Sequence, residues 1–194
     1  MASGVAKFER ACDGFEAVVR SVSRDDWDRL SPCEPWTCLD VIGHVVADLQ
    51  FATAVIEGND FATHSGFSAS RSFIDREPLE SWLSARRALQ SACTPEALVK
   101  VVRWPFGEQP VDTGLGWFSL EVLVHTWDLA RSLERDVALD AELMAEHMAR
   151  LRPLSSLLRG PGGYGPELDP PPGAGQQEQF LTFLGRKSRP SRGE

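Results

Sequence analysis

The chain has 194 residues, and its 20 Lys and Arg against 28 Asp and Glu give a formal net charge of −8. Apolar residues make up 42% and charged residues 25%, which is typical of a globular domain and excludes a disordered chain. An acidic chain lacks the basic stripe with which nucleic-acid-binding proteins neutralise phosphates. The basic residues within 186–192 are expected to form a solvated tail.

Targeting signals are not visible in the sequence. No run approaches the roughly 20 consecutive apolar residues of a membrane span, and residues 1–10 lack the apolar region of a secretory signal. The four cysteines are scattered, with no CxxC pair, which favours free thiols in a reducing compartment over a disulfide framework. We therefore expect a soluble cytoplasmic protein without a nucleic-acid or membrane partner.

Hydrophobic residues recur at helical spacing along almost the whole chain. Cap signals support several helix ends: Thr37 with Asp40 resembles a capping box, Gly58 is a stop signal, and Pro95 follows Thr94 at a helix start. The only strand signal is a possible extended pair near 99–103 and 110–113. Helices are expected at about 5–22, 37–57, 78–92, 94–101, 113–133, 140–151 (or as far as 158) and 177–184.

These elements predict an all-α fold, a four-helix bundle with a long crossover over residues 58–76. We expect the bundle and its metal site to occupy residues 1–158. Residues 159–194, with a segment rich in Gly and Pro, a short helix and a basic tail, would form an accessory segment packed on the same domain. Within it, residues 160–175 could act as a lid or as a tether.

The helix expected at 113–133 carries two residues with metal-binding chemistry. Glu121 and His125 lie one turn apart, on a helix that is apolar nearly all round and should be buried. A buried carboxylate and imidazole need partners, and a metal ion would serve both. The alternative is that the two side chains hydrogen-bond to each other or to the backbone, because E-x-x-x-H is a loose pattern.

His44 is the best candidate for a third ligand, although it lies at the margin of the apolar stripe of its helix and could instead be a surface histidine. With Glu121 and His125 it would supply two imidazoles and one carboxylate. Three protein ligands with an open fourth position are typical of a catalytic metal site. Zn²⁺ is the default ion, and the same set can hold Fe²⁺ or Ni²⁺. His64, in the crossover, is expected to be a solvated loop residue.

Two sequence blocks resemble a known family. Residues 32–45, PCEPWTCLDVIGHV, resemble the P-x-x-x-W-T-x-x-D-x-x-x-H pattern of DinB-like metalloproteins, and residues 121–130, EVLVHTWDLA, resemble their E-x-x-x-H-x-W-D-L-A helix. Residues 180–186 are similar to the tail of short members. The similar branch of this DinB/YfiT-like superfamily is the one related to the N-terminal domain of mycothiol-dependent maleylpyruvate isomerase.

The resemblance implies a DinB-type bundle in which His44, Glu121 and His125 hold a divalent metal. It also implies a low-molecular-weight thiol cosubstrate, mycothiol in this branch, and a metal-dependent S-transferase acting on a small electrophile. A metal-bound thiol is deprotonated, which makes it a nucleophile at neutral pH. The isomerase has a further C-terminal domain for which this chain has no room, so isomerisation of maleylpyruvate itself is not expected.

Further residues near the two blocks have possible roles at such a site. Asp128, on the same face as His125, could orient a ligand or a bound water, or could be a surface residue. Cys33 and Cys38 lie at the start of the second helix, where either could reach a metal or be oxidised; packing thiols are the expected role. Three tryptophans could line the thiol or substrate pocket, with core packing as the alternative: Trp36, Trp117 and Trp127.

Two other classes of function stay open. The first is a non-catalytic metal-binding or sensing protein that dimerises through the bundle. The second is a metal-dependent isomerase or hydrolase on the same site, although no carboxylate next to a ligand stands out as a general base. A homodimer is possible in each case.

Overall fold

The computed structural model describes residues 2–59, 71–74, 77–159 and 163–187. The chain divides into two compact units, Met1–Val137 and Ala138–Glu194. The sequence-based assignment of residues 1–158 to one domain and 159–194 to an accessory segment stays a prediction. His64 and most of the crossover lie outside the described residues, as do residues 160–162 of the segment rich in Gly and Pro.

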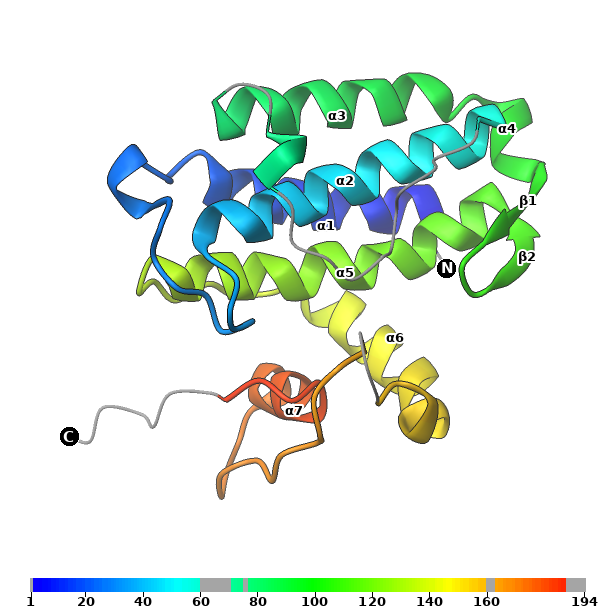
Figure 1. Ribbon diagram of the computed structural model, residues 1–194. Helices are drawn as coiled ribbons and strands as arrows, with labels where there is room; N and C mark the ends of the chain where they lie inside the picture. The colour runs from blue at the N-terminus through cyan, green and yellow to red at the C-terminus, as the bar shows by residue number, and fades with distance from the viewer. Residues whose placement is uncertain (1, 60–70, 75–76, 160–162, 188–194) are drawn as a thin grey trace. The chain divides into compact units, whose positions relative to one another are not determined.

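The first unit is built from long helices that run alongside one another (Figure 1). Helix α1 packs against α3 and α5, and α2 packs against the same two helices, which makes a four-helix bundle. The predicted all-α class is therefore confirmed. The elements of this unit are α1 (Gly4–Val19), α2 (Cys38–Glu57), α3 (Pro78–Ala92), α4 (Pro95–Val99), β1 (Val101–Trp104), β2 (Gly107–Pro110) and α5 (Val111–Ser132), with short 3-10 helices at Arg24–Asp26 and Arg71–Phe73.

Helix α2 begins and ends where its cap signals predict. The Thr37 side chain accepts a hydrogen bond from the Asp40 backbone N–H, and the Asp40 carboxylate accepts one from the Thr37 N–H at 2.8 Å. This capping box satisfies two N–H groups that the helix leaves open. Gly58 ends the helix in the left-handed conformation, with φ of 76°. The role of Asp40 is thus that of a cap.

The hairpin corrects the sequence analysis in one respect. The antiparallel pair joins Val101 to Pro110 and Trp104 to Gly107, so β2 shares only Pro110 with the segment 110–113 that was expected to be extended. Pro110 is the residue before the first turn of α5, and the helix begins at Val111. Residues 111–113 are therefore helical, because the chain turns directly from the hairpin into the bundle.

Helices α1 and α5 approach each other closely at the first turn of α1. The Asp112 carboxylate accepts hydrogen bonds from the backbone N–H groups of Gly4 and Val5, both at 2.9 Å. A Cβ atom on Gly4 would lie 1.7 Å from the Asp112 carbonyl oxygen, so only glycine fits there. This contact fixes the start of α1 against α5.

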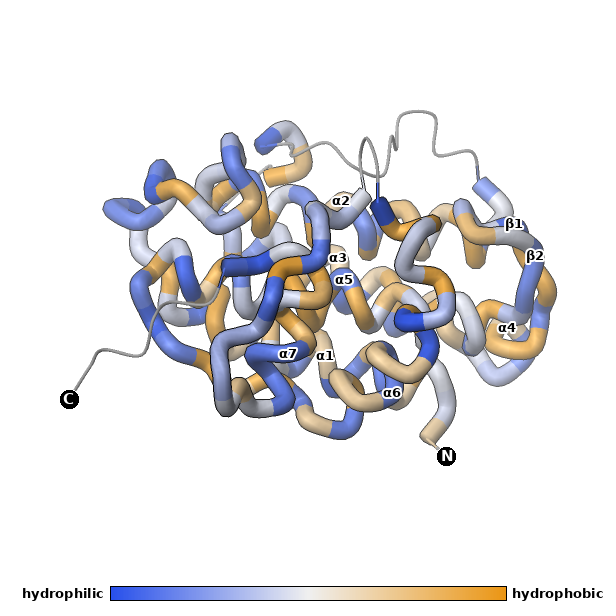
Figure 2. The backbone as a smooth tube through the Cα atoms, turned by 90° about the horizontal axis from the view of Figure 1, so that it is seen from below, coloured by the Kyte–Doolittle hydropathy of each residue, from blue (hydrophilic) through white to orange (hydrophobic). Residues whose placement is uncertain are grey.

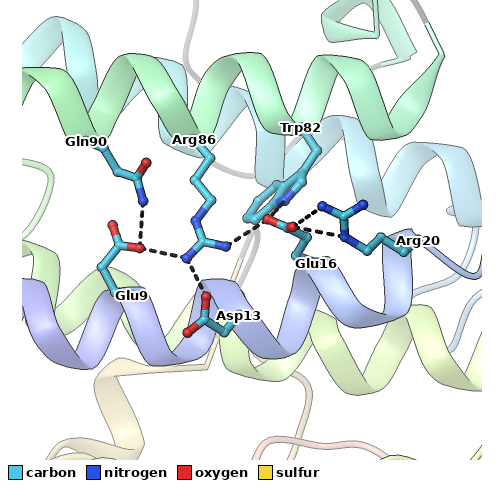
Figure 3. A network of polar contacts seen from close by, with 7 residues as sticks. All are labelled: Glu9, Asp13, Glu16, Arg20, Trp82, Arg86 and Gln90. Atoms are coloured by element: carbon cyan, nitrogen blue, oxygen red, sulfur yellow. Dashed lines mark hydrogen bonds and ion pairs between the residues drawn. The ribbon is translucent and has the colours of Figure 1, made fainter.

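A network of charged side chains joins α1 to α3 (Figure 3). The Arg86 guanidinium donates to Glu9 at 2.7 Å, Asp13 at 2.5 Å and Glu16 at 2.8 Å. The Arg86 side chain is only 13% exposed, so the three carboxylates compensate for the loss of its hydration. The network therefore holds α3 against α1 within the bundle.

The bundle core is apolar, and α2 and α5 are its most buried helices. Apolar and polar residues alternate along most of the helices (Figure 2). Among the described residues, α2 is the one helix long and apolar enough to cross a membrane, and 67% of its apolar stretch is buried inside the protein. The core helix of a soluble domain gives the same signal. The largest fully buried side chains of this unit are Phe8, Phe15, Ile42, Leu49, Trp82, Leu115 and Leu129.

The second unit contains α6 (Ala141–Leu151), a 3-10 helix at Arg152–Leu157 and α7 (Gln176–Phe183). Asp140 caps α6, as its sequence predicts, by accepting a hydrogen bond from the Leu143 N–H at 3.0 Å. The Arg159 guanidinium donates to the Phe183 carbonyl oxygen at 2.6 Å, which links the loop after α6 to α7.

Candidate metal centre

The three predicted ligands converge between α2 and α5. His44 comes from α2, and Glu121 and His125 come from successive turns of α5. One donor atom from each residue lies within 4.8 Å of the other two. The His125 Nε2 atom is 3.7 Å from the nearer carboxylate oxygen of Glu121. The helical spacing of Glu121 and His125 thus brings their side chains next to each other, as the sequence predicted.

The donor set fits a divalent metal. Nitrogen and oxygen ligands at about 2.0–2.1 Å from a tetrahedral ion lie roughly 3.4 Å apart, close to the spacing between His125 and Glu121. Two imidazoles and one carboxylate form a nitrogen and oxygen donor set that suits Zn²⁺, Fe²⁺ or Ni²⁺. His44 and His125 are 3% and 4% exposed, whereas the Glu121 side chain is 36% exposed. The carboxylate therefore marks the side of the site that is open to solvent.

The His44 side chain is more buried than its place on the helix suggested. The sequence left it at the margin of the apolar stripe, where a surface position was the alternative. In the structure the ring centroid of His44 is 4.8 Å from that of His125, nearly perpendicular to it, and 4.8 Å from that of Trp36. His44 is covered because the loop before α2 folds back over this side of the helix.

Trp36 is the predicted pocket residue that the structure brings to the candidate ligands. Its ring also stacks against His125, with centroids 5.8 Å apart. Trp36 is half-buried, so one part of its indole is available to a small molecule near the site. The ring restricts the two imidazoles to a narrow range of orientations.

The other two tryptophans lie on α5. Trp117 is one turn before Glu121, is half-buried, and has its ring centroid 6.2 Å from that of Phe106 in the hairpin turn. Trp127 is 6% exposed and lies among the core residues. A role of either residue in lining the pocket stays a prediction.

Asp128 lies on the far side of the His125 ring from Glu121. Its carboxylate oxygen is 3.0 Å from His125 Nδ1, and its side chain is completely buried. A carboxylate that binds one imidazole nitrogen fixes the tautomer and directs the other nitrogen towards a metal. The alternative interpretation of Asp128 as a surface residue is wrong, because α5 is buried on this face as well.

The environment of His125 has opposing effects on its pKa. Burial lowers the pKa, but the hydrogen bonds and charges of Asp128 and Cys33 raise it to about 10. Without a metal, the ring is therefore an imidazolium at neutral pH. A metal ion has to displace a proton from Nε2 before it binds there.

Two contacts at the site were not singled out from the sequence. The Cys33 thiol, expected to be a packing group, lies 3.1 Å from the Asp128 carboxylate. The Asp48 carboxylate lies 3.4 Å from His44 Nε2, one turn further along α2. The H-x-x-x-D spacing of His44 and Asp48 could have indicated the second contact. Nothing in the local sequence indicates the first, since Cys33 is in a loop.

Cys38 differs from Cys33, although both flank the start of α2. Cys38 is buried, and burial raises the pKa of its thiol to about 12. A thiol with that pKa is protonated at neutral pH and is neither a good ligand nor a nucleophile. Cys38 is therefore a packing residue, as the sequence predicted.

Together, the fold and the site define a class, a helical bundle that presents two histidines and a carboxylate from facing helices as a candidate metal centre. Residues 8–130 match the pattern of the mycothiol maleylpyruvate isomerase N-terminal domain family. The chain belongs to this family, in agreement with the resemblance of its two motif blocks. The matched range includes all the candidate ligands, and also Cys33, Trp36 and Asp128.

Two relatives from Mycobacterium tuberculosis are similar along almost their whole length. They are "Uncharacterized protein MT0763" of strain CDC 1551 / Oshkosh and "Uncharacterized protein Rv0738" of strain ATCC 25618 / H37Rv. Each is 30% identical over 187 residues, which cover 93% of this chain and 96% of the relative. The similarity therefore continues past the matched domain into the C-terminal unit. No solved structure matches the chain.

Proposed function

We propose that the protein is a zinc-dependent S-transferase that joins mycothiol to a small electrophilic substrate. Membership of the family implies a function related to mycothiol. The observation that carries the finer proposal is the convergence of His44, Glu121 and His125, whose donor atoms lie within 4.8 Å of one another. Three ligands leave one position for an exogenous group, which is the arrangement of a catalytic rather than a structural zinc site.

A divalent metal, when bound, would lower the pKa of a thiol at its remaining position and so supply a thiolate at neutral pH. The residues of the chain prepare for this chemistry. The Asp128 carboxylate holds His125 by its Nδ1 atom, and Trp36 restricts the orientation of both imidazoles. The solvent-exposed edge of Glu121 gives a thiol a path to the site.

In the proposed reaction the thiol sulfur forms a bond to an electrophilic carbon of the second substrate. The thiol proton goes to solvent. In an addition, the π bond of the electrophile breaks and the adjacent atom takes a proton from solvent; in a displacement, the bond to the leaving group breaks and that group departs with the bonding electrons. We further propose that the protein acts in the cytoplasm on small molecules, without a nucleic-acid or membrane partner. A homodimer is compatible with this proposal.

Calorimetric titration of mycothiol into zinc-loaded and metal-free protein tests the proposal. We expect binding to the zinc-loaded form with release of about one proton, and weak or no binding to the metal-free form. S-Methyl mycothiol, which has no thiol proton, is the matched ligand control and should bind without proton release. Equal binding of mycothiol to both forms would contradict a role for the metal in thiol recognition.

The same titration separates the alternatives. A protein that retains its metal and does not bind mycothiol would be better described as a non-catalytic metal-binding or sensing protein, or as a hydrolase. If mycothiol binds, consumption of its thiol in the presence of a panel of electrophiles then measures transfer. His44→Ala, which removes one ligand, should abolish both binding and transfer.

A further inference from the structure

A second group of metal-binding side chains lies beside the first and shares one residue with it. Cys33, His125 and Asp128 each place a donor atom within 4.8 Å of the other two. The Asp128 oxygen is 3.0 Å from His125 Nδ1 and 3.1 Å from the Cys33 sulfur. The group therefore supplies one thiol, one imidazole and one carboxylate.

The two groups use opposite nitrogens of the same imidazole. Glu121 precedes His125 by four residues and faces Nε2, whereas Asp128 follows it by three residues and faces Nδ1. A neutral imidazole has a lone pair on one nitrogen and a proton on the other, so it coordinates one metal at a time. Which nitrogen binds depends on which set of partner ligands suits the ion.

The loop that carries Cys33 is held in place by its own hydrogen bonds. The Cys33 backbone N–H donates to the Ser31 side chain at 3.1 Å, and the Trp36 N–H donates to the Cys33 carbonyl oxygen at 2.9 Å. The Ser31 N–H in turn donates to the Trp36 carbonyl oxygen at 2.9 Å. The Cys33 thiol is half-buried, so ions from solution can reach it while it faces Asp128.

We propose that Cys33, His125 and Asp128 form a second cation site, selective for soft ions such as Cd²⁺ or Cu⁺, which competes with the His44, Glu121 and His125 site for the imidazole of His125. A thiolate is the preferred ligand of soft ions, whereas two imidazoles and a carboxylate suit Zn²⁺ and Fe²⁺. The softness of the ion thus decides which site is filled. A soft ion at the second site withdraws His125 from the first.

This site does not depend on the proposed transferase activity, and metal ions alone test it. Titration of metal-free protein with Cd²⁺ should produce sulfur-to-cadmium charge-transfer absorption in the ultraviolet. We expect Cys33→Ser to lose this absorption. Cys93→Ser is the matched control, because Cys93 is also a half-buried thiol of the first unit, and it should keep the absorption.

Two further variants separate the sites. His44→Ala removes a ligand of the first site alone and should keep the cadmium absorption. Asp128→Asn removes a ligand of the second site and should weaken cadmium binding by tenfold or more. Absorption that persists in Cys33→Ser would overturn the proposal. Absorption that is lost in His44→Ala would show Cys33 to be a ligand of the first site, and would overturn the proposal as well.

Competition for His125 is tested on the zinc-loaded protein. Addition of Cd²⁺ should release one Zn²⁺ for each sulfur–cadmium bond that forms, as a zinc-sensitive dye would report. Cadmium absorption without zinc release would contradict the sharing of one imidazole. If Cys33→Ser does not fold, the wild-type protein still gives an answer. Cd²⁺ should protect Cys33 but not Cys93 from alkylation, as peptide mass spectrometry would show, and equal alkylation of both would overturn the proposal.

Discussion

Replacement of Asp128 by asparagine should change the number of protons released when the protein binds zinc. Asp128 is completely buried, and its carboxylate lies 3.0 Å from His125 Nδ1. Although burial lowers the pKa of His125, Asp128 and Cys33 raise it to about 10. Metal-free His125 is therefore protonated at pH 8, and zinc must displace one proton to reach Nε2.

The size of the effect follows from this pKa. Asparagine keeps the shape and one oxygen acceptor of aspartate but removes the charge that favours the imidazolium. Burial then lowers the pKa of His125 against the remaining effect of Cys33, so less of the imidazole is protonated at pH 8 before zinc arrives. Proton release should therefore fall, by at most about one proton per zinc ion. In the wild-type protein the pKa of His125 is about 10, so at pH 7 protons compete with zinc for this imidazole by about 4 kcal/mol.

The proton count is a better readout than affinity, because the Asp128 carboxylate also strengthens the imidazole as a ligand. Calorimetry of zinc binding at pH 8, in buffers with different enthalpies of ionisation, gives the number of protons directly. Between pH 7 and pH 9 the zinc affinity of the wild-type protein should rise by about one decade per pH unit. The zinc affinity of the variant should rise less steeply. Asp25→Asn, which removes an exposed carboxylate, is the control for the loss of charge. An equal proton count in wild-type and Asp128→Asn protein would refute the reasoning.

Two further predictions concern the bundle and are measured by urea unfolding of metal-free protein. Arg86→Leu should lower the free energy of unfolding by about 2–3 kcal/mol, because it leaves three carboxylates of α1 without their guanidinium. Arg20→Ala, at the exposed end of the network, should lower it by less than about 0.5 kcal/mol. Burial is the largest single influence on the pKa of Glu16 and raises it, but the hydrogen bonds of Arg20, Arg86 and Trp82 together lower the pKa below its ordinary value. The stability that Glu16 contributes is therefore present above its ordinary pKa and lost as the pH falls through its lowered pKa, and the cost of Arg86→Leu should shrink in acid. Gly4→Ala should cost about 1–3 kcal/mol, since its Cβ would overlap the backbone of α5. Gly14→Ala, in the same helix, adds a Cβ that would meet the Thr126 methyl group at an ordinary contact distance of 4.0 Å, and should instead stabilise the protein by about 0.5–1 kcal/mol. Arg86→Leu and Arg20→Ala should differ in their effect on stability, and so should Gly4→Ala and Gly14→Ala. An equal change in the free energy of unfolding within either pair would contradict the packing described.

The boundaries of the helices were predictable wherever a cap defined them. Thr37 with Asp40, Gly58 and Asp140 act locally, through hydrogen bonds or a left-handed backbone, so the sequence contains the information. The second strand was misplaced because Pro110 serves both the hairpin and the start of α5. That choice depends on how the hairpin meets the bundle, which is a tertiary property.

The candidate site was predictable within a helix and not between segments. Glu121 and His125 follow from a single helical turn, whereas the burial of His44 depends on the loop that places Trp36 over it. The contact of Cys33 with Asp128 joins residues 95 positions apart. No local pattern contains such a contact, because the path of the loop is set by its own turns and by the bundle.

The metal content of purified protein tests the central claim most directly. After zinc loading and desalting, the wild-type protein should keep one ion per chain, and His125→Ala should keep none. His147→Gln, which changes a buried histidine of α6, is the control and should keep the ion. Circular dichroism would verify that each variant is folded. A folded His125→Ala variant that retains one zinc ion per chain would contradict the account, because His125 is the residue on which both candidate sites depend.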